Sequence, residues 1–329
     1  MPSAEDNLIA RFFKPLATHP GAFGLADDAA VFAPPPGHEI VLKTDAVIAG
    51  VHFLPDDPPD TVARKASRAN LSDLAGKGAQ PAGFLLSIAL PKETDEAWLA
   101  RFCAGLASDA LAYGCPLFGG DTDRTPGLLA ITILAFGTVP AGRMVQRAGA
   151  TPGDVVAVSG SIGDAALGLK LRRDPALAAR WSLSDEDRDF LLARYRIPEP
   201  RVALAPVLRE CASAAMDISD GLAGDLAKLC RVSNVTASVE VAKVPLSPGA
   251  RRALAADPAL REPVLTGGDD YEILFTVPAA RWKACAKAAA EAGVVVAAIG
   301  TIEAGDAAPV LIGDDGQAVT FARLSYSHF

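Results

Sequence analysis

Short runs of Val, Ile, Leu and Phe alternate in the first part of the chain with longer segments whose apolar residues recur every three or four positions. The short runs predict buried strands, and the longer segments predict helices with one apolar face. We expect strands at Glu39–Asp45, Phe84–Leu90 and Leu128–Val139, and helices between them at Asp60–Lys77 and Thr94–Tyr113. Strands and helices therefore alternate up to about residue 140.

A stretch rich in Pro and Gly, from Pro140 to Asp154, indicates the crossing into a second domain. Beyond it we expect a buried strand at Val155–Val158 and a strand-to-helix turn at Ser159–Asp164. The further predicted elements are helices from Ala165 and at Asp185–Arg196, Arg201–Ala212, Gly221–Arg231 and Ala279–Ala292, strands at Ala237–Val241, Tyr271–Val277 and Val294–Ile299, and a hairpin-like tail from Ala308 to Phe329. Because 329 residues are many for one hydrophobic core, we expect two domains, residues 1–140 and 141–329. Both mix strands and helices, so these patterns leave the class open between α/β and α+β.

Aspartates recur in clusters beside small or turn-forming residues. The clusters are Asp27-Asp28, Thr44-Asp45, Ser72-Asp73, Asp121-Thr122-Asp123, Asp217-Ile218-Ser219-Asp220 and Asp269-Asp270. Unpaired carboxylates repel one another, so gathering them is favourable only around a strong positive charge. Oxygen ligands suit Mg²⁺, Mn²⁺ or Ca²⁺, and Mg²⁺ usually shares its remaining positions with waters and substrate phosphates. The pattern predicts a Mg²⁺-dependent phosphoryl-transfer enzyme whose carboxylates converge in one cleft.

Two of these clusters follow a pair of glycines, Gly119-Gly120 before Asp121 and Gly267-Gly268 before Asp269. Adjacent glycines allow a sharp turn whose N–H groups are open to a phosphate. The alternative for each is an ordinary turn with an aspartate at a helix N-cap. The recurrence favours the phosphate interpretation.

The other candidates also have structural alternatives. Ser219 or Asp220 is expected to cap the following helix, whereas Asp217 and Ser219 would share one side of an extended segment and contact metal or phosphate. Asp73 lies near an apolar helix face, where either a metal or Lys77 would pair it.

Arg147 and His52 are candidates of a different kind. Arg147 could bind phosphate bidentately, although it could also be an ordinary surface arginine. His52 could contact substrate, although a lone histidine is more often structural. The loop Ser159–Asp164 lacks the lysine of a phosphate-binding P-loop, and the H-R-D and D-F-G segments of protein kinases are missing from the sequence.

Composition narrows the class further. The net charge of −8 argues against a nucleic-acid partner. No apolar stretch approaches the roughly 20 residues of a membrane span, and the segment up to Arg11 has no signal-peptide pattern. The five cysteines are scattered and form no C-x-x-C pair, which favours reduced thiols and a cytoplasmic location.

Taken together, these segments resemble the thiamine-monophosphate kinases of the aminoimidazole ribonucleotide synthetase-like superfamily. The segments that carry the resemblance are Leu8–Phe13, Asp27–Ala30, Thr44-Asp45, Gly50–Phe53, Asn70–Ala75, Gly119–Thr122, Asp217–Leu222, Gly267–Glu272 and the terminal His328-Phe329. The resemblance implies a homodimer whose subunits have an α+β N-terminal domain and an α/β C-terminal domain. It implies transfer of the ATP γ-phosphate to thiamine monophosphate, which gives thiamine diphosphate and ADP.

The resemblance also implies roles for individual residues. It makes Asp28, Thr44, Asp45, Asp73, Asp121, Asp217 and Asp220 ligands of several Mg²⁺ ions, Gly120, Asp121, Arg147 and Ser219 contacts of ATP, and His52 and Asp269 contacts of thiamine monophosphate. Asp121 and Arg147 would be the catalytic pair.

The chain departs from the family pattern at Ala26, Lys43 and Asp269, where the family usually has Gly, Ser or Thr, and Glu. The C-terminal aromatic residue expected on thiamine is replaced by Arg323, with Phe321 and Tyr326 nearby. Two other functions stay open at this point. One is another ATP-dependent reaction of the superfamily, on an amide or a selenide. The other is a non-catalytic protein that binds nucleotide or divalent cations.

Overall fold

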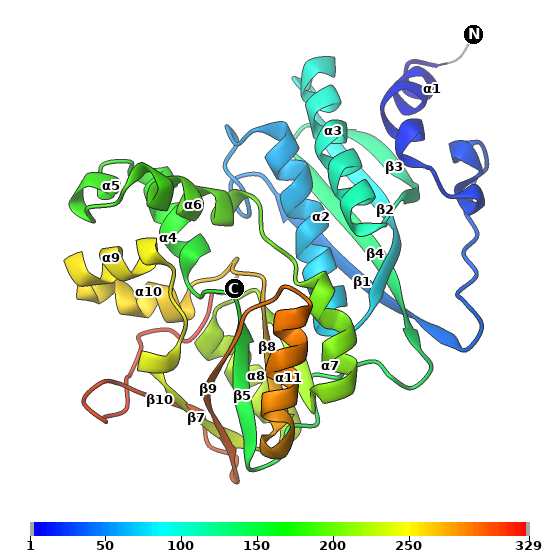
Figure 1. The fold of residues 1–329 in the computed structure, drawn as a ribbon. Coiled ribbons are helices and arrows are strands. Elements are labelled where there is room, and N and C mark those ends of the chain that lie inside the picture. Colours follow the sequence, from blue (N-terminus) through cyan, green and yellow to red (C-terminus); the bar gives the residue numbers. More distant parts are fainter. Residues whose placement is uncertain (1–2, 327–329) are drawn as a thin grey trace. The chain divides into compact units, whose positions relative to one another are not determined.

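The protein is described here by a computed structural model that covers residues 3–326 and forms two compact units (Figure 1). The first unit extends to Gly142, except for Ala75–Gly78, which group with the second unit. The second unit continues from Arg143. Among the described residues, no helix combines the length and the apolar composition needed to cross a membrane.

The first unit is built on a four-stranded sheet in the order β1-β4-β2-β3. Its strands are β1 (His38–Ile48), β2 (Gln80–Pro91), β3 (Leu117–Thr125) and β4 (Ala130–Pro140). The pair β2–β3 is parallel and the other two pairs are antiparallel. Helices α2 (Pro59–Gly76) and α3 (Glu96–Tyr113) lie against the same side of this sheet (Figure 1). The chain enters the unit through α1 (Ala4–Leu8) and the short helices η1 (Ile9–Phe13), η2 (Lys14–Leu16) and η3 (Pro20–Leu25).

Local sequence explains the elements of this unit. Alternate residues of β2, including Leu86 and Ile88, are buried, as the period of two in a strand requires. Helix α3 begins where the Asp95 side chain accepts a hydrogen bond from the Trp98 N–H, and it ends at Gly114 in the left-handed conformation. The predicted strands and helices of the first domain are thus confirmed.

The glycine pair of the first domain is the exception. Gly119-Gly120 was expected to form a sharp turn, but both residues lie inside strand β3. The expectation was wrong because β3 has few apolar residues after Phe118, so it lacks the hydrophobic pattern of a strand.

The second unit contains a six-stranded sheet in the order β10-β7-β9-β5-β8-β6. Its strands are β5 (Asp154–Ser159), β6 (Ala214–Ile218), β7 (Thr236–Glu240), β8 (Glu272–Pro278), β9 (Val296–Glu303) and β10 (Val310–Ile312). Only the β7–β10 pairing is parallel among these described strands. The helices are α4 (Asp164–Arg173), α5 (Leu177–Arg180), α6 (Asp185–Arg196), α7 (Ala205–Cys211), α8 (Leu222–Ser233), α9 (Pro248–Ala256), α10 (Arg261–Thr266) and α11 (Trp282–Glu291). Short helical turns η4 (Val202–Leu204), η5 (Val241–Lys243), η6 (Pro258–Leu260) and η7 (Ala279–Arg281) complete the unit.

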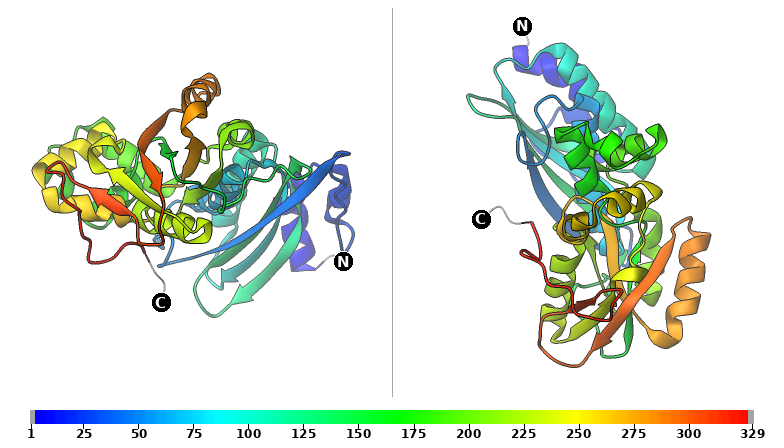
Figure 2. Two further views of the ribbon diagram at one scale, coloured as in Figure 1. Left: turned by 90° about the horizontal axis from the view of Figure 1, so that it is seen from below. Right: turned by 90° about the vertical axis from the view of Figure 1, so that its left-hand side faces the viewer.

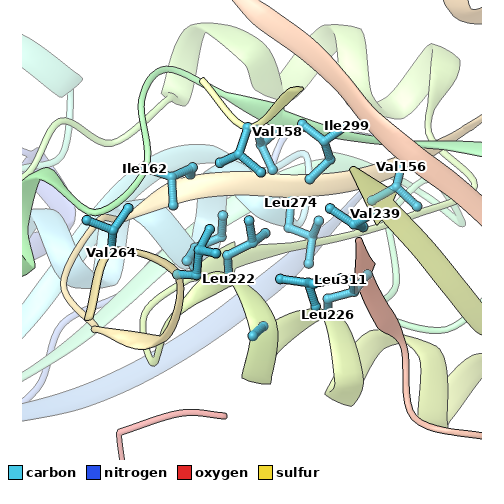
Figure 3. Close-up of a cluster of buried hydrophobic side chains, with 14 of the residues drawn as sticks. Val156, Val158, Ile162, Leu222, Leu226, Val239, Val264, Leu274, Ile299 and Leu311 are labelled. Atoms are coloured by element: carbon cyan, nitrogen blue, oxygen red, sulfur yellow. The ribbon is translucent and has the colours of Figure 1, made fainter. Parts of the chain in front are cut away.

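Both faces of this sheet are buried. Val156, Val158 and Leu274 point into a large core with residues of α8 and α10 (Figure 3). Their neighbours Ala157 and Phe275 point to the opposite side, into a second core formed with α7 and α11. Burial on both faces explains why these strands appear in the sequence as continuous apolar runs.

Some predicted boundaries in the second domain need correction. Helix α6 runs from Asp185 to Arg196 as expected, whereas α5, α9 and α10 were not predicted. The tail forms strand β10 and a small reversal that brings Ile312 beside Ala318. The terminal pair His328-Phe329 lies outside the described residues. Figure 2 gives two further views of both units.

Candidate functional site

A cavity of about 680 Å³ lies in the first unit at the edge strand β3. The segment Asp27–Ala30, which follows η3, forms one wall, and Gly119–Thr122 of β3 form another. The remaining lining residues are Glu5, Ile9, Phe13, Leu25, Leu85, Leu86, Leu117 and Phe118. The cavity therefore brings together Asp28, Gly120 and Asp121, which are far apart in sequence.

Gly120 is required by close packing at this wall. A Cβ atom at this position would lie 1.7 Å from the carbonyl oxygen of Leu86, which no side chain can accommodate. The adjacent Asp121 is exposed, and its carboxylate accepts a hydrogen bond of 3.0 Å from the Thr122 N–H. The sequence thus places an exposed carboxylate beside a stretch of backbone that carries no side chain.

The register of the sheet separates Asp121 from Asp45. Asp45 lies opposite Ile133, Ile133 opposite Leu86, and Leu86 opposite Gly120. Residues paired across strands share a face, so Asp45 and Gly120 face the helices, and the next residue, Asp121, faces the other side. The same argument places Thr44 on the face of Asp121, because Thr44 pairs with Leu134.

On the helix side, Lys43 joins two of the predicted metal ligands. Its Nζ atom lies 3.1 Å from Asp45 Oδ1 and 2.9 Å from Asp73 Oδ2 on α2. Burial lowers the pKa of Lys43, but the attraction of Asp73 and Asp45 outweighs burial and leaves this pKa above its ordinary value. The ammonium group of Lys43 thus bridges these two carboxylates. The alternative partner for Asp73, Lys77, instead donates a hydrogen bond of 2.6 Å to the carbonyl oxygen of Ala215.

Asp217, Ser219 and Asp220 form the end of β6 and the turn before α8 in the second unit. Asp217 is buried, with 4% of its surface exposed. The N–H groups of Ser219 and Asp220 each donate a 3.0 Å hydrogen bond to the buried carboxylate of Asp225. Burial raises the pKa of Asp225 above its ordinary value.

Two details of this turn differ from expectation. Neither Ser219 nor Asp220 caps α8, because the N-cap is Gly221 and no side chain bonds there. The turn is held from the helix side by Asp225 instead. Asp220, a predicted metal ligand, forms an ion pair of 2.5 Å with Lys228, which also lies 2.8 Å from Asp225.

Asp269 lies directly against the same turn. Its N–H donates a 2.9 Å hydrogen bond to the carbonyl oxygen of Ser219, and the N–H of Tyr271 donates one of 2.8 Å to that of Ile218. The two aspartate clusters of the second domain therefore meet, although about 50 residues separate them in sequence.

The two remaining candidates lie elsewhere. His52 lies in the turn after β1, where its Nδ1 accepts a hydrogen bond of 3.0 Å from the Ile48 N–H. Arg147 is exposed in the segment that leads to β5.

The predicted metal ligands thus fall into several groups: Asp28 with Asp121, Asp45 with Asp73, Thr44, and Asp217 near Asp220. Within residues 3–326, no three His, Cys, Asp or Glu side chains gather closely enough to hold a metal ion. Lys228, Asp225 and the buried Arg194 described below were not among the residues predicted from the sequence. One feature of the sequence could have indicated Asp225, because it is a charged residue among the apolar positions of α8.

Comparisons with known proteins show which family the chain belongs to. Residues 26–139 match the family described as AIR synthase related protein, N-terminal domain, and residues 151–312 match the corresponding C-terminal domain. The chain is also 41% identical to the thiamine-monophosphate kinase of Caulobacter vibrioides, over 99% of this chain and 91% of the relative. The chain belongs to the thiamine-monophosphate kinase family. The fold expected from the resemblance, two domains of the AIR synthase related kind, is therefore confirmed.

Solved structures of this family have the same fold. The thiamine-monophosphate kinase of Stenotrophomonas maltophilia matches with a TM-score of 0.82 and 35% identity, covering 95% of this chain and 96% of that one. A structure described as AaThiL complexed with AMPPCP and TMP matches with a TM-score of 0.77 and 30% identity, covering 94% and 97%. This member of the family thus matches its relatives along nearly its whole length.

Proposed function

We propose that this protein transfers the γ-phosphoryl group of ATP directly to thiamine monophosphate, which yields thiamine diphosphate and ADP. The end-to-end match to thiamine-monophosphate kinases carries the proposal. A related structure described as a complex with AMPPCP and TMP supports both substrate classes. The cavity at β3, at about 680 Å³, falls within the range of about 300–1,000 Å³ that is usual for small-molecule sites.

The ATP side of the site is proposed to involve this cavity. Gly120 lines the cavity with backbone atoms, and Asp28 and Asp121 offer carboxylate oxygens. The lining residues include Glu5, Asp27, Asp28 and Asp121 and, among the described residues, no lysine or arginine. An acidic cavity repels a polyphosphate unless cations intervene.

The donor set at the cavity fits Mg²⁺, because hard oxygen ligands from one or two carboxylates leave positions for phosphate and water. We propose Asp28 and Asp121 as ligands of a Mg²⁺ ion at this cavity, and Thr44 and Asp217 as ligands of Mg²⁺ at other positions. When bound, Mg²⁺ would supply positive charge that neutralises the phosphates.

The carboxylates of Asp45, Asp73 and Asp220 fit a different role. Lys43 bridges the first two and Lys228 pairs the third. We propose that lysine ammonium groups replace part of the metal charge at these positions.

The phosphate acceptor, thiamine monophosphate, does not need a strong general base from the protein. A phosphate monoester has a second pKa near ~6, so at neutral pH its oxygen is already an oxyanion. The proposed task of the protein is alignment and charge neutralisation, so that attack on the γ-phosphorus is in line with the leaving oxygen. His52 and Asp269 are proposed to orient thiamine monophosphate, while Arg147 and Ser219 are proposed to contact the phosphates of ATP.

We further propose a homodimer. Ile40 and Leu42 are large apolar side chains left exposed, although they lie on strand β1 of the first unit. The register pairs Ile40 with Thr138 and Leu42 with Phe136, which places these side chains on the sheet face opposite α2 and α3. An exposed apolar sheet face favours a partner of the same kind. A cytoplasmic location is proposed as well, supported by the five free cysteines.

The deciding experiment is a coupled assay for ADP together with chromatography of thiamine diphosphate. We expect both products in equal amounts from ATP, thiamine monophosphate and Mg²⁺, and neither product with EDTA. A purified, folded protein that forms no thiamine diphosphate at saturating substrates would refute the proposed function.

A further inference from the structure

The turn Gly267–Tyr271 is held in an unfavourable backbone conformation. Asp269 has φ of 73° and Tyr271 has φ of 51°, although neither is a glycine. Left-handed φ values are uncommon for residues with a Cβ and persist only where surrounding structure imposes them. The structure around this turn must therefore supply the constraint.

Part of the constraint is the contact with the Asp217–Asp220 turn. In addition to the two backbone hydrogen bonds from Asp269 and Tyr271, Gly268 packs so closely that a Cβ atom would lie 2.4 Å from the carbonyl oxygen of Ser219. A shift of one turn therefore displaces the other. These contacts join the residue proposed for thiamine monophosphate, Asp269, to the residue proposed for ATP, Ser219.

The rest of the constraint is a buried ionic network beneath the turn. The Asp270 carboxylate accepts hydrogen bonds from the backbone N–H groups of Gly163, at 2.7 Å, and Ala165, at 3.3 Å. The fully buried Glu272 accepts one of 2.6 Å from Ser159 Oγ. The turn is thus anchored at both acidic residues that follow Asp269.

Two arginines neutralise Glu272. Arg201 donates from Nε at 2.7 Å and from Nη2 at 2.6 Å, which is a bidentate contact. Arg194 on α6 donates from Nη2 to Glu272 Oε1 at 2.8 Å and also to the backbone carbonyl oxygen of Asp270 at 3.0 Å. Arg194 therefore bonds the buried carboxylate and the backbone of the turn with one nitrogen.

We propose that Arg194 is a positioning residue for the phosphate acceptor: by bonding Glu272 and the Asp270 carbonyl, it holds the Gly267–Tyr271 turn in the conformation that presents Asp269. Arg194 lies outside every motif in the sequence, and its side chain is buried, so it acts through the turn and not by touching substrate. This inference rests on the proposed function for the role of Asp269. The restraint of the turn itself is independent of that function.

The test compares Arg194→Lys and Arg194→Met with Arg188→Lys. Arg188 lies on the same helix, but its side chain is 40% exposed and pairs with Asp185 and Asp189. Lysine at position 194 keeps the charge but loses the planar shape and reach of arginine. All kinetic measurements are made at a temperature at which circular dichroism shows each variant to be folded.

We expect Arg194→Lys to raise KM for thiamine monophosphate by about tenfold or more and to raise KM for ATP less, because the turn that carries Asp269 loses its restraint directly and the turn that carries Ser219 only through it. Hydrogen exchange of a peptide spanning residues 267–272 should accelerate by about tenfold or more, with no change in β5. Arg188→Lys should leave both measurements unchanged.

The outcomes separate this inference from the proposed function. A folded Arg194→Lys with wild-type KM and wild-type exchange at residues 267–272 would show that Arg194 only stabilises the fold. If Arg194→Met does not fold, the lysine variant decides. If the wild-type protein forms no thiamine diphosphate, the proposed function fails, and hydrogen exchange still decides whether Arg194 restrains the turn.

Discussion

At the scale of single residues, position on a strand determines what a carboxylate can contact. Asp121 and Asp123 are both exposed on β3, but only Asp121 lines the cavity. Asp45 is similar in sequence context and yet faces the helices, where Lys43 pairs it. Chemically equivalent aspartates therefore differ in function because the pleat and the register direct them to different surroundings.

Asp121→Asn should lower kcat by about a hundredfold or more, because it removes a carboxylate proposed to hold the metal that stabilises phosphoryl transfer. The coupled ADP assay measures this effect. Asp123→Asn is the matched control and should keep a rate within about twofold of wild type. Equal rates in both variants would contradict the assignment of Asp121.

Lys43→Ser should increase the number of Mn²⁺ ions bound per chain, or their affinity, because it removes the ammonium that now neutralises Asp45 and Asp73. Electron paramagnetic resonance measures free Mn²⁺ in such a titration and requires no turnover. Lys43→Arg keeps the charge and should bind as the wild type does. An unchanged titration for Lys43→Ser would show that Lys43 does not substitute for a metal.

The C-terminal residue that contacts thiamine is proposed to be Tyr326. Its N–H donates a 3.0 Å hydrogen bond to the carbonyl oxygen of Asp220, and half of its surface is exposed, whereas Phe321 packs against the core of the second unit. Tyr326→Ala should raise KM for thiamine monophosphate about tenfold through the loss of ring stacking. Phe321→Ala should instead lower the melting temperature, and the opposite pattern of effects would assign the role to Phe321.

At the scale of elements, hydrophobic periodicity predicted the long helices and buried strands well and the polar edge strand poorly. Helix α6 and strand β8 have clear patterns because each buries a continuous face. Strand β3 lacks such a pattern because it lies at the edge of the sheet. Its Gly, Asp and Thr residues line a cavity and do not pack in the core. Similarly, the turn before α8 is held by Asp225, whose carboxylate accepts hydrogen bonds from the N–H groups of Ser219 and Asp220. Such a tertiary contact has no local sequence signature.

The cysteines of α3, α8 and α11 lie on the buried sides of their helices, which predicts slow reaction with iodoacetamide in the folded protein. Burial raises the pKa of Cys103 to about 12, that of Cys230 to about 11 and that of Cys285 to about 12. A raised pKa leaves almost no reactive thiolate at pH 8. Mass spectrometry should find these three alkylated only after unfolding, whereas the partly exposed Cys211 reacts first. Rapid native labelling of Cys103 would contradict the packing of α3.

At the scale of the whole molecule, the open sheet face of the first unit is the proposed dimer surface. Leu42 is 68% exposed there, and Leu42→Glu would place a charge in an apolar interface. We expect sedimentation to show a dimer for wild type and a shift toward monomers for this variant. Leu111→Glu, on the helix α3 and 87% exposed, is the control and should stay dimeric. A wild-type protein that sediments as a monomer would refute the proposed dimer surface.

The sequence by itself determined the family, the chemistry of oxygen ligands and the main helices and strands, because these depend on residue type and spacing. Tertiary structure alone decided which carboxylates meet. It placed Asp28 and Asp121 at one cavity, paired Asp45 and Asp73 through Lys43, and joined Asp269 to Ser219. The physical reason is that these contacts depend on register, on which face a side chain occupies and on charge balance inside the fold. None of these properties is a function of local sequence.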